Sequence, residues 1–353
     1  MNLRVLCSLY LALIFMTHFA YENLIFTSTL GLDPVYNDEM TFLNFTQSNC
    51  HWLDLTRSLF IYNAGQAAPF ACLVQAVKHN AVNAPLVIRM ANGLCVILMV
   101  LFFQRQAKIR PAEAMAFRIA QYALLLSPTI LFFSTKVLRD TILTMLVTIS
   151  FLCLRNKKIA PSLLALCLTF ALRRHLAVSM AMGYMIAAIM GTPFGGALTA
   201  ILAATGLSWL EFGPFANFKG SFAEYMTTWP FSMSGLHFLI ADSRLFLASF
   251  ERIILQRLLA ADTFIPNIIL IIFAILPRTC ARLFNGIARF LLPCNVWYLY
   301  FYFDAGFTAA RQTIMPFLPL VFLALADLAV TNGWLRRKQR PLPPHSNQLQ
   351  TNA

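Results

Sequence analysis

The sequence predicts an all-α protein, a polytopic transmembrane bundle of about ten helices, from its composition and from two patterns along the chain. Of the 353 residues, 59% are hydrophobic and only 12% are charged, which is too little polar surface to cover a soluble domain of this length. Several apolar runs are long enough to cross about 30 Å of hydrocarbon as helices of roughly 20 residues. Between these runs the chain carries clusters of lysine and arginine, as cytoplasmic loops of membrane proteins do.

These basic clusters set the predicted topology. They are RQAKIRP (105–111), RNKK (155–158), RTCARLFNGIAR (278–289) and RRKQR (336–340), and none of them contains an acidic residue. The positive-inside rule places all four in the cytoplasm, together with Arg4 and both termini. The net charge of +13 is therefore interpreted as a topological signal, and no nucleic-acid partner is predicted.

With these loops inside, about ten spans follow along the chain. The first is interpreted as a retained helix and not as a signal peptide, because its apolar core is long and no small-x-small cleavage site follows it. The predicted spans are residues 5–27, 83–104, 117–135, 140–154, 160–173, 176–191, 194–211, 262–277, 290–303 and 312–331.

The run between residues 160 and 191 is predicted to be two helices, divided at Arg173, Arg174 and His175. Both flanking basic clusters are assigned to the cytoplasm, so an even number of crossings must separate them. One helix over this run would give three crossings, and two helices give four. The division also keeps three cationic side chains away from lipid, where their burial would be costly.

Two longer segments, residues 28–82 and 212–261, are predicted outer loops. HWLDLTRSLFIY (51–62) has apolar residues at helical spacing, and Pro69 opens a second such stretch. Amphipathic helices of this kind lie on a membrane surface. Residues 1–335 are therefore predicted to form a single transmembrane domain, and residues 336–353 a basic, disordered cytoplasmic tail.

Most of the remaining ionisable groups fall at outer helix ends or in outer loops under this topology. Such groups are costly at membrane depth unless they line water or pair with one another, so the set predicts an outward-facing polar cavity. The alternative is structural. Asp140 would pair with Arg139 or Lys136 at the N-terminus of a helix, and the other charged side chains would extend to the membrane interface. The residues are Asp33, Asp38, Glu39, Lys136, Arg139, Asp140, Arg173, Arg174, His175 and Arg311.

Carboxylates beside several arginines suit a particular substrate class. Arginine binds phosphate with a bidentate fork, and a carboxylate can take a proton from an attacking hydroxyl as a general base. A lipid-linked sugar phosphate matches both features and enters from the bilayer. Asp38 or Glu39, in the loop after the first span, would then activate the acceptor hydroxyl.

Four short segments resemble the GT-C glycosyltransferases and the related polysaccharide polymerases of bacterial inner membranes. The last of the four is similar to the helix, with an arginine followed by two prolines, near the end of many of those proteins. The segments are YNDEMTFL (36–43), APLVIRMANGLCVIL (84–98), SPTILFFSTKVLRDTILTM (127–145) and AGFTAARQTIMPFLPLVFLALAD (305–327).

The resemblance implies roles for individual residues. Asp38 and Glu39 correspond to the first-loop acids that act as catalytic base, and Asp38 also to a ligand for a divalent cation, Mg or Mn. Arginines hold the lipid phosphate in that family, which nominates Arg139, Arg174 and Arg311. The other members of the predicted cavity are assigned to substrate binding as well, namely Lys136, Asp140, Arg173 and His175.

The expected function is that of a multi-pass enzyme of the bacterial inner membrane. It would transfer a sugar or oligosaccharide from a polyprenyl phosphate or pyrophosphate carrier to a glycan acceptor in surface polysaccharide synthesis, alone or with other assembly proteins. One alternative is an O-antigen-type block polymerase, which needs arginines for two pyrophosphate groups and no metal. Another is a flippase or transporter of an anionic solute, although the two halves of the chain show no related pattern.

Overall fold

The computed structural model describes residues 2–23, 42, 68–190, 262, 265–270, 272–273, 291 and 315–332, and every regular element in these ranges is a helix. The predicted all-α class is confirmed for this part of the chain. The elements are α1 (Leu3–Asn23), α4 (Ala68–Asn80), α5 (Ala84–Ile109), η3 (Pro111–Glu113), α6 (Ala114–Leu126), α7 (Pro128–Ser134), α8 (Asp140–Arg155), α9 (Ile159–Leu172), α10 (Arg174–Met190), η6 (Met315–Phe317) and α17 (Leu318–Thr331).

Capping side chains and prolines mark where these helices begin. The side chain of Asn83 accepts a hydrogen bond from the backbone N–H of Leu86, 3.0 Å away, at the start of α5. Ser127 caps α7 in the same way, and Pro128 is the first residue of that helix. Proline is tolerated at these positions because the first N–H groups of a helix have no partner within it.

The capping at Ser127 corrects one predicted span. Residues 117–135 were expected to be one helix, but α6 ends at Leu126, and α7 continues at an angle of 55°. Pro128 supplies no backbone N–H, and it disfavours the helical conformation for Ser127 before it, which is extended. The chain therefore bends at Ser127 and does not continue as a straight helix.

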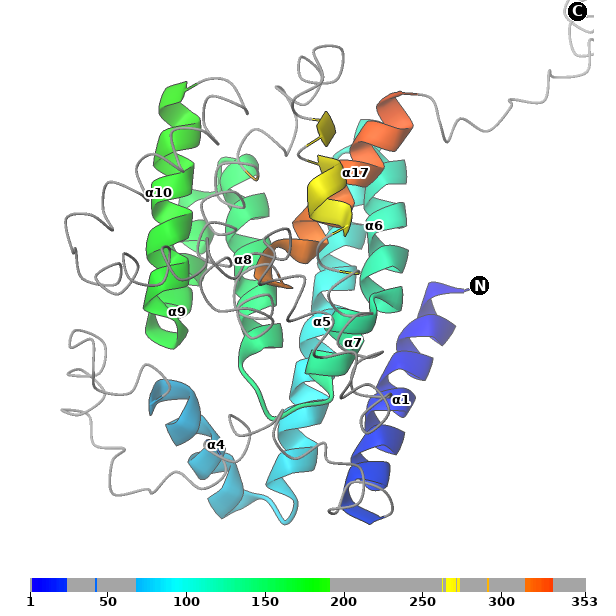
Figure 1. Cartoon of the computed structure of the whole chain (residues 1–353), viewed down its shortest axis with the longest axis vertical. Coiled ribbons are helices and arrows are strands. Elements are labelled where there is room, and N and C mark those ends of the chain that lie inside the picture. The colour runs from blue at the N-terminus through cyan, green and yellow to red at the C-terminus, as the bar shows by residue number, and fades with distance from the viewer. Residues whose placement is uncertain are drawn as a thin grey trace, which may run out of the picture.

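The helix α5 lies at the centre of the arrangement, where it contacts α1, α6 and α8 (Figure 1). Beyond α8 lie α9 and then α10, and α17 packs against α6 on the opposite side. Helix α4 lies near the end of the bundle where α5 begins (Figure 1). Two buried apolar clusters hold these helices together, one around Phe117, Phe151 and Val321, and the other around Tyr10, Val96 and Phe133.

The division predicted at Arg173 is confirmed. Ser150 of α8 contacts Ser162 near the start of α9, and Asp140 contacts Arg173, so α8 and α9 are antiparallel. The ring of Tyr184 in α10 lies 6.1 Å from that of Phe151 in α8, far from Asp140 along α8. The chain therefore reverses at Arg173, and α10 runs back along the bundle.

The first two basic clusters lie side by side at one end of the bundle, as predicted. Both guanidinium nitrogens Nη1 and Nη2 of Arg155 donate to the carboxylate of Glu113 at 2.7 Å. Nε of Arg110 donates to Oδ1 of Asn156 at 3.1 Å. We call this end, formed by residues 105–113 and 155–158, the basic end. The opposite end, where α8 begins and α9 stops, is called the Asp140 end.

Only part of the predicted set of spans is supported by helix length. By length and composition, the described residues hold one helix that would cross a bilayer alone, Ala84–Ile109, and a second if the bent pair Pro111–Leu126 and Pro128–Ser134 forms one span. Several described helices are apolar but shorter, namely Leu3–Phe19, Ile159–Leu172, Leu176–Met185 and Met315–Thr331. The predicted spans 194–211 and most of 290–303 lie outside the described residues, as do the outer loop 212–261 and the tail 336–353.

Close packing of α1 on α5 depends on Gly93. A Cβ atom at this position would lie 2.6 Å from Cδ1 of Ile14 and 3.0 Å from Cδ2 of Leu11. We expect Gly93→Leu to separate the two helices and to lower the free energy of unfolding by about 1–3 kcal/mol, as overpacking does. The measurement is the melting temperature of the purified protein in detergent. Ala91→Leu is the matched control on an exposed face of α5, and equal melting temperatures for the two variants would contradict the prediction.

Candidate functional site

The Asp140 end holds a buried pair of opposite charges. Nη2 of Arg173 lies 3.0 Å from Oδ1 of Asp140, and the two side chains are only 2% and 1% exposed. Asp140 is the first residue of α8, and Arg173 is the extended residue between α9 and α10. Removing two charges from water is expensive, and their attraction offsets that loss only with good geometry. A buried ion pair of this kind makes the Asp140 end a candidate functional site.

Arg139 lies beside the pair and is tied to the same helix end. Its Nη1 donates a hydrogen bond to the backbone carbonyl of Leu172, the last residue of α9. The last carbonyl groups of a helix have no partner within it and carry partial negative charge. Arg139 therefore stabilises the end of α9 while it positions a second guanidinium close to Arg173.

Lys136 is fully buried in the connection between α7 and α8. Its Nζ lies over the ring of Phe132, 5.1 Å from the ring centroid, in the geometry of a cation–π contact. Burial lowers the pKa of Lys136 well below its usual value, because the charged form loses its hydration.

Asn92 of α5 fixes the shape of this connection. Its Nδ2 donates to the backbone carbonyls of Lys136 at 2.8 Å and of Leu138 at 3.0 Å. Oδ1 of Asn92 and the hydroxyl of Thr141 are buried and have no hydrogen-bond partner among the described residues. Buried acceptors without a partner are rare in proteins. Asn92 therefore holds the connection between α7 and α8 in place, and its Oδ1 is a buried hydrogen-bond acceptor beside Lys136.

A second polar group is buried on α1 and α5 near the same end. Nη1 of Arg89 lies 2.6 Å from Nδ1 of His18, and the amide of Asn83 lies 3.1 Å from Nε2 of the same ring. Because arginine only donates, Nδ1 of His18 acts as the acceptor. Arg89 precedes Asn92 by three residues and therefore lies on the same face of α5.

The structure thus brings together four of the residues predicted for substrate binding: Lys136, Arg139, Asp140 and Arg173. With Asn92 they form what we call the Asp140 cluster. Arg174 and His175 begin α10 directly after it, and their side chains lie outside the described part. The predicted residues Asp33, Asp38, Glu39 and Arg311 also lie outside the described residues.

Sequence reasoning missed Asn92, His18 and the role of Arg89. A single arginine or asparagine within an apolar run is a signal, because such residues rarely face lipid. Arg89 and Asn92 both stand in the run APLVIRMANGLCVIL. The carbonyl groups that Asn92 contacts lie more than 40 positions later in the chain, and no spacing rule predicts that contact.

A metal site is not formed by the described residues. They contain no group of three His, Cys, Asp or Glu side chains placed to hold an ion, and the proposed ligand Asp38 lies outside them. Comparison with known proteins gave no match to a family model, to a curated protein or to a solved structure. What the Asp140 cluster does must therefore be inferred from its own chemistry.

Proposed function

We propose that this protein is a multi-pass glycosyltransferase of the bacterial inner membrane, with about ten spans in a GT-C-like bundle. It would transfer a sugar or oligosaccharide from a polyprenyl phosphate or pyrophosphate to a glycan acceptor. The observation that carries the proposal is the Asp140 cluster, a buried set of charges at the end of the bundle opposite to the basic end. Arg139 and Arg173 both have guanidinium groups at this end, one on the carbonyl of Leu172 and the other on the carboxylate of Asp140, and guanidinium forks suit phosphate.

The placement in a membrane is supported by the surface of the helices. Large apolar side chains are exposed along successive turns of α1, α5 and α9, and an apolar surface of this extent is typical of contact with lipid or a partner. The exposed residues include Val5, Leu9, Leu13, Leu94, Leu98, Leu101, Leu164 and Leu168.

The orientation is supported by a disulfide. Cys72 in α4 is disulfide-bonded, and α4 lies at the Asp140 end (Figure 1). Disulfides persist in oxidising compartments such as the periplasm and are rare in the cytoplasm. The basic end would face the cytoplasm by the positive-inside rule. Both criteria give the same orientation, with the Asp140 cluster and the substrate on the periplasmic side.

The acids proposed for catalysis precede Phe42 by only a few residues. Phe42 is buried against α4, with its ring 4.9 Å from that of Phe70, and its carbonyl accepts a hydrogen bond from Nε2 of Gln75. In the sequence Asp38 and Glu39 stand four and three residues before Phe42, and each residue of an extended chain adds at most about 3.6 Å. This supports a role for these two acids beside the cluster.

The proposed reaction uses these groups in one displacement. A carboxylate of Asp38 or Glu39 takes the proton of the acceptor hydroxyl, whose oxygen forms a bond to the anomeric carbon of the donor sugar. The bond from that carbon to the phosphate oxygen breaks, and the polyprenyl phosphate leaves with the electron pair. The guanidinium groups of Arg139 and Arg173 would stabilise the negative charge that develops on the leaving group.

Two other functions would use the same cluster differently. An O-antigen-type polymerase would bind two polyprenyl pyrophosphate chains and transfer a whole glycan from one to the other without a metal. A transporter of an anionic solute would move its substrate across the bilayer and leave it chemically unchanged. Incubation of the purified protein with a lipid-linked oligosaccharide separates the two enzymes from the transporter, since only the enzymes release polyprenyl phosphate or pyrophosphate.

Arg174 and Arg311, whose side chains lie outside the described part of the structure, give the sharpest test of phosphate binding. We expect Arg174→Lys and Arg311→Lys to express normally but to weaken donor binding by about 1.5–3 kcal/mol each, because lysine lacks the planar fork. The measurement is the apparent KM for the lipid-linked donor in proteoliposomes. Arg105→Lys, at an exposed position of the basic end, is the matched control. If both test variants match this control, charge alone is needed and the phosphate assignment is wrong.

A further inference from the structure

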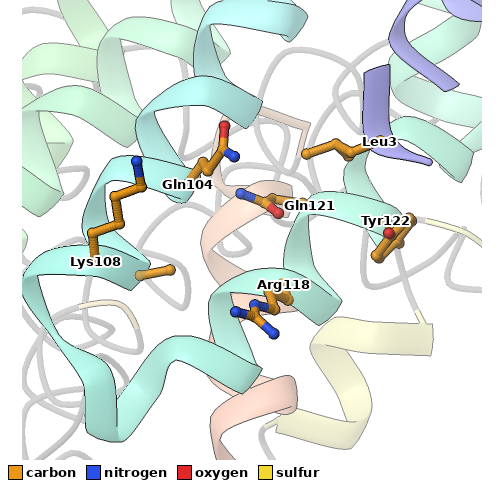
Figure 2. A pocket seen from close by; sticks show the side chains of 7 residues that line it. Leu3, Gln104, Lys108, Arg118, Gln121 and Tyr122 are labelled. Atoms are coloured by element: carbon orange, nitrogen blue, oxygen red, sulfur yellow. The ribbon is translucent and has the colours of Figure 1, made fainter. Parts of the chain in front are cut away.

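A cavity opens at the basic end, away from the Asp140 cluster. Its volume is about 400 Å³, and it lies between the start of α1, the end of α5 and the start of α6. Figure 2 shows the polar side chains of Gln104 and Lys108 from α5 beside those of Arg118 and Gln121 from α6, with Leu3 and Tyr122 toward α1. The distance along α5 from Asn92 to Lys108 is roughly 24 Å at 1.5 Å per residue, so this is a separate site.

The lining of the cavity is cationic and rich in donors. Lys108 and Arg118 are exposed to it, and no carboxylate among the described residues lines it. Nε2 of the buried Gln121 donates to the backbone carbonyl of Val100 at 3.1 Å, which fixes the position of this side chain on the cavity wall. An ammonium and a guanidinium around one hollow suit an oxyanion with several acceptor atoms, such as a phosphate ester.

The cavity also lies where an apolar surface meets a polar one. Along α5 the exposed face changes from Leu98 and Leu101 to Gln104 and Lys108. Along α6, in the reverse direction, it changes from Leu126 through Tyr122 to Arg118. Aromatic residues followed by cations are typical of the boundary between hydrocarbon and lipid headgroups. A ligand here would therefore carry an acyl chain beside its charged group.

We propose that this cavity binds the phosphate of an anionic phospholipid headgroup at the cytoplasmic surface of the membrane. Lys108 supplies a point charge, Arg118 supplies a bidentate fork, and the acyl chains lie on the leucine face of α5. Basic pockets between helices on the cytoplasmic side of membranes bind lipid headgroups through this chemistry. The site goes beyond the transferase proposal, because it uses none of the residues of the Asp140 cluster.

The test measures binding to the full-length protein in detergent, without any transfer assay. Two probes are compared, namely phosphatidylglycerol, with phosphatidylcholine as the zwitterionic reference without net charge, and soluble glycerol 3-phosphate. We expect the double variant Lys108→Gln, Arg118→Gln to weaken phosphatidylglycerol binding about fivefold for each cation removed, or roughly 25-fold in all. Bound lipid is quantified by native mass spectrometry, and glycerol 3-phosphate by calorimetry.

The matched control is the double variant Lys157→Gln, Lys158→Gln, which removes the same charge from exposed positions of the basic end. Loss of phosphatidylglycerol binding in the cavity variant and not in the control supports the lipid site. Loss of glycerol 3-phosphate binding in the same pattern supports a phosphate site filled from solution. Equal phosphatidylglycerol and glycerol 3-phosphate binding by the cavity variant, the control and the parent would overturn the proposal. Arg118→Lys keeps the charge and removes the bidentate fork. If the double variant does not fold, phosphatidylglycerol binding is measured on this single variant instead.

Discussion

Asp38→Asn and Glu39→Gln are expected to give the largest loss of activity, with product formation reduced about 100-fold or more by whichever change removes the general base. Each substitution keeps the shape of the side chain and removes its charge, so the acceptor hydroxyl would no longer lose its proton to the enzyme. The measurement is the amount of glycan product, with membrane expression measured in parallel. Asp38 and Glu39 are tested singly, because only one of them need be the base.

The control for this pair is Asp54→Asn, which removes another carboxylate from the same predicted outer loop. It should leave both expression and product unchanged. Full activity in Asp38→Asn and in Glu39→Gln would exclude either acid as the base. A fall in product that follows a fall in protein level would show that the acids contribute to folding and not to catalysis.

Asp140→Asn is expected to have the largest effect on stability, with a loss of about 3–5 kcal/mol in the free energy of unfolding. The change removes the carboxylate from a guanidinium that is only 2% exposed, so Arg173 keeps its charge without its ion-pair partner. The melting temperature in detergent is the measurement. A change no larger than that of a surface variant would show that the pair contributes little to the fold.

Two further variants separate stability from function at this pair. Asp140→Leu combined with Arg173→Met removes both charges, and we expect it to recover most of the lost stability, because two apolar side chains often replace a buried ion pair without loss. Transfer should nevertheless stay absent, since the phosphate would lose a guanidinium. Activity equal to that of the parent would show that the pair is structural. Glu113→Gln should cost less than Asp140→Asn, because its pair with Arg155 is partly exposed and screened by solvent.

The charge pattern along the chain was sufficient to predict the break at Arg173 and the ends of the helices around it. Charged residues inside an apolar run are costly in contact with lipid, which favours a turn at that point. The helices α8 and α9 accordingly begin and end within about a residue of the predicted spans 140–154 and 160–173. The bend at Ser127 was missed, although Pro128 was visible, because hydropathy averages over such a position.

The site was predicted only in part, because the charge pattern identifies only its charged residues. The sequence predicts one side of the protein for four charged residues that the structure places together, namely Lys136, Arg139, Asp140 and Arg173. Asn92 and His18 carry no fixed charge, so the charge pattern does not assign them to the predicted cavity. Their partners lie on other helices, Lys136 and Leu138 for Asn92, and Arg89 for His18.

By itself the sequence determined the helical class of the described residues, the position of the clusters 105–111 and 155–158 at one end of the bundle, and the break at Arg173. These properties depend on hydropathy and charge, which are local and additive along the chain. Only the tertiary structure decided that Asp140 pairs with Arg173, that Arg139 caps α9, and that Asn92 holds the connection at Lys136. Such contacts depend on how far each helix is rotated and shifted against its neighbours. That is set by the packing of many apolar side chains at once, and no single position in the sequence records it.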